Sequence, residues 1–165
     1  EKNPHKLAQK DIDARWTKKN DETHYGYKNH VKVDVDSKII TDYATTSANI
    51  HDSNEFSEFL GEDDKVIYAD SAYVGKEIPK HVENRICEKG YRGKPLTDEQ
   101  KESNRRKSKI RCRIEHVFGF ITVSMHGLTV RSIGIKRAEF NIGLTNLVYN
   151  FCRYTILKRK EVYMG

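Results

Sequence analysis

The sequence predicts a mixed α/β fold in which helices pack over a β-sheet. Three observations support this: an alternation of polar and apolar residues after residue 24, a short apolar run that ends at Asp70, and two long segments with apolar residues at helical spacing. Alternation with a period of two indicates a half-buried strand, whereas a period near 3.6 indicates an amphipathic helix. Strands and helices interspersed in this way form a sheet with helices on its faces.

The first third of the chain predicts a hairpin preceded by an arm. Residues 1–22 are polar and irregular, and we expect a loop or arm there. From Tyr25 alternate positions are apolar, which predicts a strand with one buried face. The segment Asp36-Ser37-Lys38 supplies a turn, and Ile39 to Thr46 is expected to be the return strand.

The middle of the chain predicts two short helices around a buried strand. Asp52, with a glutamate three residues later, resembles a capping box and predicts a helix that ends at Gly61. The continuous apolar run from Lys65 to Asp70 suits a strand covered on both faces. A second helix is expected from Glu77 to Glu88, where apolar residues recur at every fourth position.

Two longer helices are expected after the glycines at positions 90 and 93. The first runs from Thr97 to Met125 and carries an apolar stripe that follows the 3.6-residue period. Arg111 and Glu115 lie one turn apart at the edge of that stripe. The second helix is expected from Ile135 to Lys158.

The length and the charge of the chain restrict the functions it can have. The 165 residues amount to one domain, and the formal charge of +6 favours an acidic partner. Charges of each sign are segregated along the sequence, which is more informative than the net value. Acidic residues gather between positions 52 and 64, and basic residues gather at Lys101, Arg105, Arg106, Lys107, Lys109, Arg111 and Arg113.

Several classes of protein are disfavoured. The three cysteines are far apart and form no Cys-x-x-Cys pair, so neither a disulfide framework nor a zinc site is expected. No apolar segment is long enough to span a bilayer and no signal peptide opens the chain, so we expect a cytoplasmic protein without a membrane partner. No glycine-rich phosphate loop is present, and no small-molecule cofactor is expected. The first residue is not Met, so we expect a processed product or a piece of a longer protein.

Two acidic residues stand where they can act on a polyanion. Asp70 closes the apolar run, and Glu115 lies on the basic helical segment. Carboxylates on a strand end and on a basic helix can hold divalent cations that activate an attacking oxygen and stabilise a leaving one in phosphoryl transfer. Taken singly, each has an ordinary explanation, with Asp70 capping a turn and Glu115 pairing with Arg111.

The best candidates for contacts with DNA are basic residues of the same segment, because neutralising phosphates requires clustered Lys and Arg. Arg111, Arg105 and Lys109 are the leading ones. Lys28, on the polar face of the first predicted strand, is a further candidate, although a solvated sheet face explains it equally well.

Four segments together resemble the DDE transposases of bacterial insertion sequences, in the superfamily of insertion-sequence families four and five. They occur in the family's order between about Asp13 and Arg153 and read His24-Tyr-Gly-Tyr-Lys-Asn-His30, Tyr68-Ala-Asp-Ser-Ala-Tyr73, Asn104-Arg-Arg-Lys-Ser-Lys-Ile-Arg-Cys-Arg-Ile-Glu-His-Val-Phe-Gly119 and Leu147-Val-Tyr-Asn-Phe-Cys-Arg153. The second and third of these segments, taken together, are specific for this family, whereas either one alone would be weak evidence.

This resemblance implies an RNase H-like fold with a site for Mg²⁺ or Mn²⁺ made by two aspartates and a glutamate. Asp70 matches the second aspartate, Glu115 the glutamate, and Arg111 the arginine one turn before it. The implied activity is cleavage at the ends of an insertion sequence followed by strand transfer into target DNA. The implied protein is a homodimer associated with the bacterial nucleoid.

The first aspartate of the family lies on a strand that precedes the hairpin, and the sequence offers no match for it. Asp11 and Asp13 have polar neighbours, and Asp34 is typical of a turn. We therefore expect a sheet without its first strand, an incomplete metal site, and an exposed strand edge that favours self-association. A non-catalytic DNA-binding or regulatory transposase fragment, or a host nuclease of the same fold, remains an alternative.

Overall fold

The structure is a computed structural model that describes residues 3–19, 21–127 and 129–164. The chain forms two compact units. One unit combines Glu1–His51 with Gly119–Gly165, and the other is the continuous segment Asp52–Phe118. Both contain strands and helices, so the predicted mixed α/β class is confirmed at that level.

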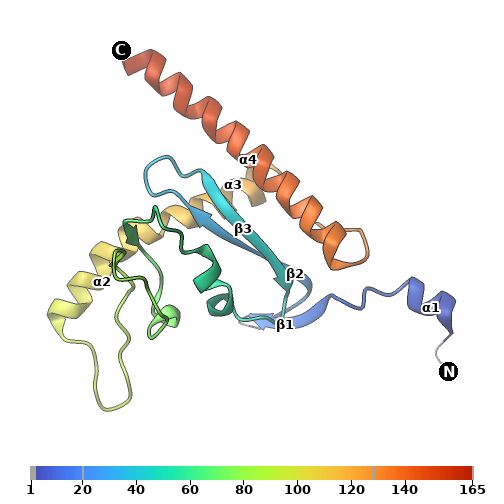
Figure 1. The fold of residues 1–165 in the computed structure, drawn as a ribbon, viewed down its shortest axis with the longest axis horizontal. Coiled ribbons are helices and arrows are strands. Elements are labelled where there is room, and N and C mark those ends of the chain that lie inside the picture. Colours follow the sequence, from blue (N-terminus) through green and yellow to red (C-terminus); the bar gives the residue numbers. More distant parts are fainter. Residues whose placement is uncertain (1–2, 20, 128, 165) are drawn as a thin grey trace. The chain divides into compact units, whose positions relative to one another are not determined.

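The first unit contains an antiparallel three-stranded sheet in the order β1-β2-β3 (Figure 1). The strands are β1 (Arg15–Lys19), β2 (Glu22–Val33) and β3 (Ile40–Ser47), and the short helix α1 (Pro4–Ala8) precedes them. We expected an irregular arm over residues 1–22, and this is wrong for Arg15–Lys19, which form strand β1. Trp16 lies opposite Tyr25 with the ring centroids 5.0 Å apart, and this cross-strand aromatic pair attaches the segment to the sheet.

The predicted hairpin is confirmed by the pairing of β2 with β3. Asp34 fixes its turn, because one carboxylate oxygen accepts hydrogen bonds from the Ser37 backbone N–H at 2.7 Å and from the Ser37 hydroxyl at 2.6 Å. These bonds hold the pKa of Asp34 below its ordinary value. Lys38 completes the turn with a φ of 59°. Asp34 is thus a turn residue, as its sequence context predicts.

Asp11 and Asp13 tie the N-terminal segment to the start of the last helix, α4 (Ile135–Met164). Asp11 accepts a hydrogen bond from the Tyr27 hydroxyl at 2.7 Å and from the Gly134 N–H at 3.2 Å, and Asp13 accepts one from the Ile135 N–H at 3.0 Å. Burial raises the pKa of Asp11, but these and other hydrogen bonds outweigh it and leave the pKa below its ordinary value.

Helix α4 lies along the hairpin and covers one face of it (Figure 1). The amides of Asn146 and Asn29 exchange two hydrogen bonds of 2.8 and 3.1 Å. Asn150 binds both backbone groups of Ile40, at 2.9 and 2.8 Å. Gly143 leaves room for Tyr43 in this contact, since a Cβ at Gly143 would overlap the Tyr43 hydroxyl and displace that side chain. The predicted last helix is thus confirmed.

Within the described residues, no helix combines the length and apolar character that a transmembrane segment needs. Helix α4 is long enough at 30 residues, but charged and amide side chains recur along it. Beyond the hairpin turn its C-terminal part continues past the sheet (Figure 1).

The second unit is built around two short parallel strands, β4 (Val66–Ile67) and β5 (Glu83–Asn84). Backbone hydrogen bonds extend this pairing beyond the strands themselves. Glu83 N–H binds the Lys65 carbonyl at 2.8 Å, Arg85 N–H binds Ile67 at 2.9 Å, and Cys87 N–H binds Ala69 at 3.0 Å. The prediction of a strand leading into Asp70 is therefore confirmed in its backbone, although its residues are only half-buried.

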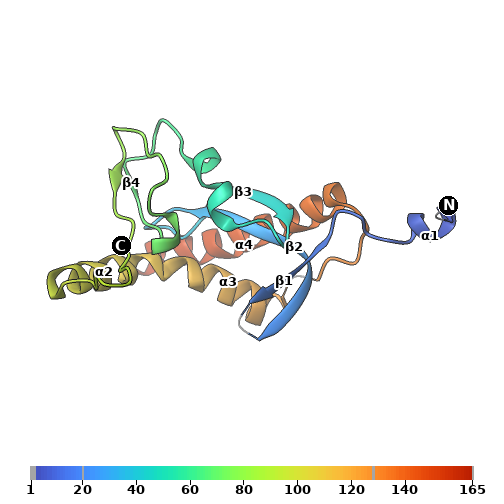
Figure 2. The ribbon, with the colours of Figure 1, turned by 90° about the horizontal axis from the view of Figure 1, so that it is seen from below.

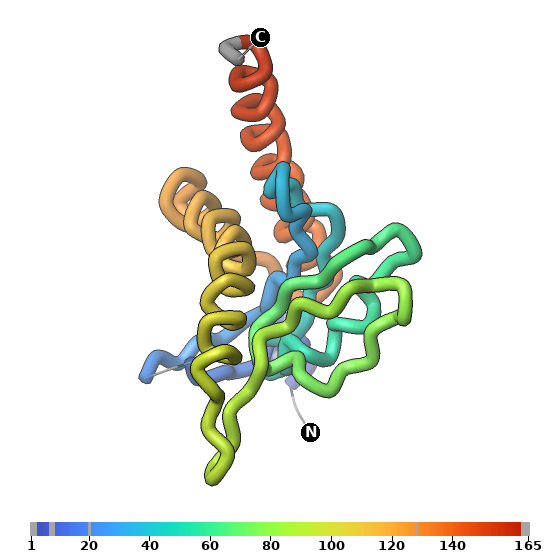
Figure 3. Tube along the Cα trace, turned by 90° about the vertical axis from the view of Figure 1, so that its left-hand side faces the viewer, coloured from blue at the N-terminus to red at the C-terminus, as the bar shows by residue number. Residues whose placement is uncertain are grey.

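The expected helix from Glu77 to Glu88 is wrong, because β5 occupies its centre. Val82 and Ile86 are both buried, and a spacing of four residues fits a strand with a period of two as well as a helix. Further upstream, the helix expected from Asp52 to Gly61 is reduced to two 3₁₀ turns, η1 (Asp52–Asn54) and η2 (Phe56–Phe59). Figure 3 shows how much of this region follows an irregular path.

The long predicted helix is present as two helices, α2 (Asp98–Arg111) and α3 (Arg113–Ser124), separated by a turn at Cys112 (Figure 2). Thr97 starts α2 with a capping box, in which its hydroxyl accepts a hydrogen bond from the Gln100 N–H at 3.2 Å. The break at Cys112 lies between Arg111 and Glu115, but Glu115 N–H still binds the Cys112 carbonyl at 3.0 Å.

Helix α2 is fastened to the segment that follows β5. The Asn104 amide accepts a hydrogen bond from the Glu88 N–H at 2.8 Å and donates one to the Glu88 carbonyl at 2.9 Å. One turn later the Lys107 ammonium donates to the Ile86 carbonyl at 3.0 Å and lies 3.6 Å from the Glu88 carboxylate. These contacts fix the position of α2 relative to β5.

We predict that Asn104→Ala destabilises the protein by about 2 kcal/mol, because both backbone groups of Glu88 lose their partner in a half-buried position. Chemical denaturation monitored by circular dichroism measures the effect. The matched control is Glu102→Ala on the exposed part of the same helix, which should change the stability by less than about 0.5 kcal/mol. Equal stability of the two variants would show that the Asn104 contacts contribute nothing.

Candidate functional site

Asp70 directly follows the backbone pairing of β4 and is exposed. Its Oδ1 accepts a hydrogen bond from the Ala72 N–H at 2.8 Å, so it caps the 3₁₀ turn η3 (Ser71–Tyr73). Its Oδ2 accepts no hydrogen bond from the residues that the structure describes. The turn therefore orients the carboxylate while leaving one oxygen available to a cation.

Tyr73 connects Asp70 with a second acidic residue. Its ring packs against the buried Phe56, with centroids 5.0 Å apart. Burial, together with the charges of Asp52 and Asp70, raises the pKa of Tyr73 to about 12. Two carboxylates thus act on one hydroxyl. The sequence assigned Asp52 only to a helix cap, and nothing in the local pattern indicated its proximity to Tyr73.

Glu115 lies in the first turn of α3. Its Oε1 is 3.4 Å from Nη2 of Arg111, and the Glu115 side chain is 62% exposed. The helical spacing of four residues produces this pair, as the sequence predicted. Because the pair is accessible to solvent, its contribution to stability is small, and the carboxylate can exchange the arginine for another cation.

The other predicted DNA contacts are divided between the two units. Arg105 and Lys109 are exposed on α2, the helix that carries Arg111. The guanidinium of Arg105 is 3.9 Å from the Glu102 carboxylate, a solvent-exposed pair. Lys28 belongs to the other unit, where its ammonium donates a hydrogen bond to the Ile50 carbonyl at 2.7 Å.

Asp70 and Glu115 both lie in the unit Asp52–Phe118, one after β4 and the other in α3. Carboxylate oxygens are the ligands that Mg²⁺ prefers, so both residues suit such an ion chemically. Across the described residues, however, no group of three or more His, Cys, Asp or Glu side chains is arranged to hold a metal ion. Among the described residues, Asp70 and Glu115 are therefore not accompanied by a third side chain that would complete a metal site.

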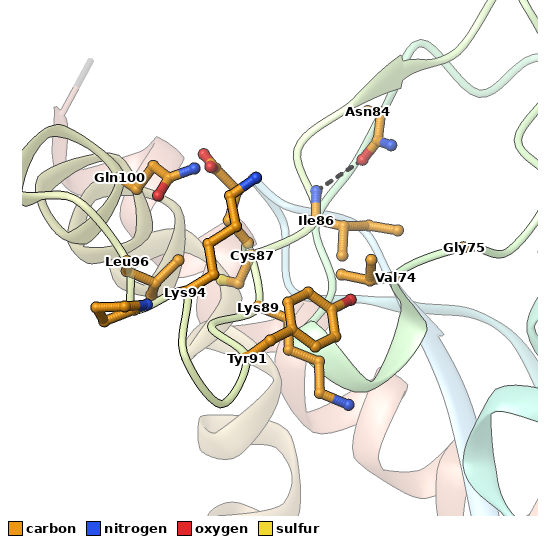
Figure 4. A pocket seen from close by; sticks show the side chains of 12 residues that line it. Val74, Gly75, Asn84, Ile86, Cys87, Lys89, Tyr91, Lys94, Leu96 and Gln100 are labelled. Atoms are coloured by element: carbon orange, nitrogen blue, oxygen red, sulfur yellow. Dashed lines mark hydrogen bonds between the residues drawn. The ribbon is translucent and has the colours of Figure 1, made fainter.

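A cavity of about 380 Å³ opens in the same unit and is shown in Figure 4. Tyr91 and Lys94 lie on one side of it, and Val74 and Ile86 on the other. Ile86 N–H is held by the Asn84 side chain at 2.9 Å. The lining contains neither Asp70 nor Glu115, so this cavity is separate from the predicted catalytic residues.

Comparison with known proteins identifies relatives of the chain. The family model described as a transposase DDE domain matches residues 3–151. A transposase for insertion sequence element IS1106 from Neisseria meningitidis serogroup B is 35% identical over 117 residues, which are 67% of this chain and 40% of the relative. The chain thus spans less than half of that relative. The comparison with solved structures found no significant match.

We predict that Asp70→Asn lowers the pKa of Tyr73 from about 12 toward its ordinary value of 10.0, because one of the negative charges that oppose ionisation is removed. Ultraviolet titration of tyrosinate, with the spectrum of Tyr73→Phe subtracted, measures this pKa. Glu62→Gln, which removes an exposed carboxylate elsewhere in the unit, is the control and should leave it unchanged. An identical Tyr73 titration in Asp70→Asn would contradict the arrangement.

Proposed function

The chain belongs to the transposase DDE domain family, and we propose that it forms a large part of the catalytic core of a bacterial DNA transposase. The proposed reaction is divalent-metal-dependent cleavage of DNA at the ends of an insertion sequence, followed by strand transfer into target DNA. Its place of action is the nucleoid, where that DNA lies. The observation that carries the proposal is Asp70, an exposed carboxylate fixed at the end of β4 within the family's domain.

Asp70 and Glu115 are the proposed metal ligands and catalytic residues. A divalent cation, Mg²⁺ or Mn²⁺, supplies activation of the attacking oxygen and neutralisation of the phosphoryl oxygens when it is bound. The cap at Ala72 keeps the Asp70 carboxylate oriented, and the Arg111 guanidinium lies 3.4 Å from the Glu115 carboxylate. Arg111, Arg105 and Lys109 are proposed to bind backbone phosphates along α2, with Lys28 as a further contact.

The proposed fold is RNase H-like, and open strand edges support it. Strand β1 pairs only with Glu22–Gly26, so on that edge Tyr27–Val33 of β2 have no neighbouring strand among the described residues. In the second unit, β4 has β5 on one edge, and no other strand of the described residues pairs with its second edge. Such edges are sites at which a further strand can pair. We propose that a strand ending in the first aspartate of the family pairs with the open edge of β4.

Two observations favour a second function. The described residues contain no three-residue metal cluster, and Glu115 is paired with Arg111 rather than with a neighbouring acid. A non-catalytic DNA-binding or regulatory fragment would have these properties. It would retain the basic face of α2 and bind DNA without cleaving it.

We predict that the full-length protein nicks DNA carrying its element ends in the presence of Mn²⁺, and that Asp70→Asn and Glu115→Gln each reduce nicking by at least about 100-fold, as expected when a metal ligand loses its charge. Gel electrophoresis of end-labelled DNA measures the product. Glu102→Gln on the same basic segment is the control and should retain activity. Unchanged nicking in both site variants would remove these carboxylates from the mechanism.

We also propose that the protein is a homodimer, and the exposed stripe on α4 supports this. Its residues are 49–71% exposed and alternate at spacings of four and three, namely Phe140, Leu144, Leu147, Phe151 and Tyr154. That spacing is the heptad pattern with which two helices pack against one another. The opposite side of α4 is already used, because Ile142 and Asn146 are buried against the hairpin. A second copy of this helix fits the stripe.

We predict that the 165-residue chain self-associates, and that the double substitution Leu144→Glu with Leu147→Glu converts it to a monomer, because charges replace apolar contacts at the centre of the stripe. Multi-angle light scattering measures the mass in solution. Lys160→Glu, on the same helix outside the stripe, should leave the mass unchanged. A monomeric wild-type chain at working concentration would contradict the proposal.

A further inference from the structure

A second cavity of about 310 Å³ lies between the strand pair and α2. Tyr68, from the extended segment after β4, and Arg85, directly after β5, line one wall. The other wall is formed by residues of α2, namely Ser103, Arg106, Lys107 and Ile110. The whole cavity belongs to the unit Asp52–Phe118.

The lining is rich in hydrogen-bond donors and contains no carboxylate. Three of its six residues are cations. Lys107 and Arg85 each have an acidic neighbour, Glu88 and Glu83 respectively. The Arg106 guanidinium, by contrast, has no ion-pair partner in the described parts of the chain. The protein therefore leaves an excess of positive charge at this cavity.

Two hydroxyl groups accompany that charge. The side chains of Tyr68 and Ser103 are half-buried, and neither hydroxyl is hydrogen-bonded to another residue that the structure describes. A guanidinium with two hydroxyls can donate several hydrogen bonds to one tetrahedral anion, which is the chemistry of phosphate recognition. The volume of about 310 Å³ far exceeds the roughly 10–15 Å³ that one water molecule needs, so a phosphate group has room.

The cavity is also close to the proposed catalytic carboxylate along the chain. Tyr68 and Asp70 are two residues apart in a segment whose backbone pairing continues to Ala69. Residues two apart in an extended chain are separated by about 6.6 Å along the backbone. A group held at Tyr68 is thus a neighbour of a group held at Asp70.

We propose that this cavity binds a backbone phosphate of the DNA strand that is cleaved, with Arg106, Tyr68 and Ser103 as the donors. The assignment rests on the proposed function, in which DNA is the substrate. It adds a phosphate site beside Asp70 to the exposed basic residues of α2. Because Arg106 has no protein partner to lose, its substitution should leave the fold intact.

The test measures binding of the 165-residue chain to a fluorescent 20-base-pair DNA duplex by anisotropy over a series of KCl concentrations. We expect Arg106→Ala to weaken binding roughly tenfold and to reduce the slope of log affinity against log salt by about 1, because one phosphate contact is lost. Tyr68→Phe should weaken binding several-fold with an unchanged slope, since it removes a neutral donor. Arg92→Ala, an exposed arginine outside the cavity, is the matched control and should change neither quantity.

The outcomes separate this assignment from the proposed function. If Arg106→Ala binds with the affinity and slope of the wild type while Asp70→Asn abolishes nicking by the full-length protein, the cavity assignment is wrong and the transposase proposal stands. If Arg106→Ala and Arg92→Ala weaken binding equally, the contribution is general surface charge, and the cavity assignment is also wrong. If the wild-type chain and the full-length protein both fail to bind DNA, the proposed function fails as well.

Discussion

The hydrogen bonds of Asn104 to Glu88 are the constraint on which the candidate site depends. On one side of this contact, the parallel pairing of Lys65–Ala69 with Glu83–Cys87 sets the position of Asp70. On the other side, α2 leads through the turn at Cys112 to Glu115. Because the Asn104 amide binds both backbone groups of Glu88, the strand pair and the helix hold one another in register. The unit has few other regular elements, so a small number of hydrogen bonds determines the place of both carboxylates.

The charges of the basic segment serve two different purposes, which the sequence alone does not separate. Lys107 is only 15% exposed in its side chain and fastens α2 to Ile86 and Glu88. Lys101 pairs with Asp98 at the start of the helix. Arg106 and Lys109, by contrast, remain available to an external anion. Runs of like charge are thus partly structural, and only the geometry indicates which members can neutralise phosphates.

The sequence predicted the elements whose patterns have a single interpretation. The alternation after Tyr25 and the apolar residues at helical spacing after Ile135 each led to the observed element, and the apolar stripe expected from Thr97 led to the helical segment that α2 and α3 share. It failed where a pattern fits two structures, as with Val82 and Ile86, whose spacing of four residues suits both a helix and a strand. Parallel pairing with β4 decided in favour of the strand, and such pairing depends on residues distant in sequence.

Part of the candidate site was predictable, because some of its residues belong to patterns with a single interpretation. The pair Arg111 and Glu115 follows from helical spacing, and Asp70 follows from its place after an apolar run. The proximity of Asp52 to Tyr73 does not follow from a sequence pattern. It accompanies the packing of Phe56 against the Tyr73 ring, a contact between segments that no local pattern connects. The cavity lined by Tyr68 and Arg106 likewise combines a strand and a helix that no local pattern connects.

Among the residues that the structure describes, β4 has one edge without a neighbouring strand, and the exposed carboxylate of Asp70 follows the same strand. Side chains that follow parallel strands meet at the same edge of a sheet, where ligands commonly bind. A strand that pairs with β4 in the parallel sense would therefore end beside Asp70, and an acidic residue at its end would lie close to the Asp70 carboxylate. Two carboxylates in that position repel one another unless a cation lies between them. On the proposed fold, the same pairing that would complete the sheet would also bring together the carboxylates that could hold a divalent ion.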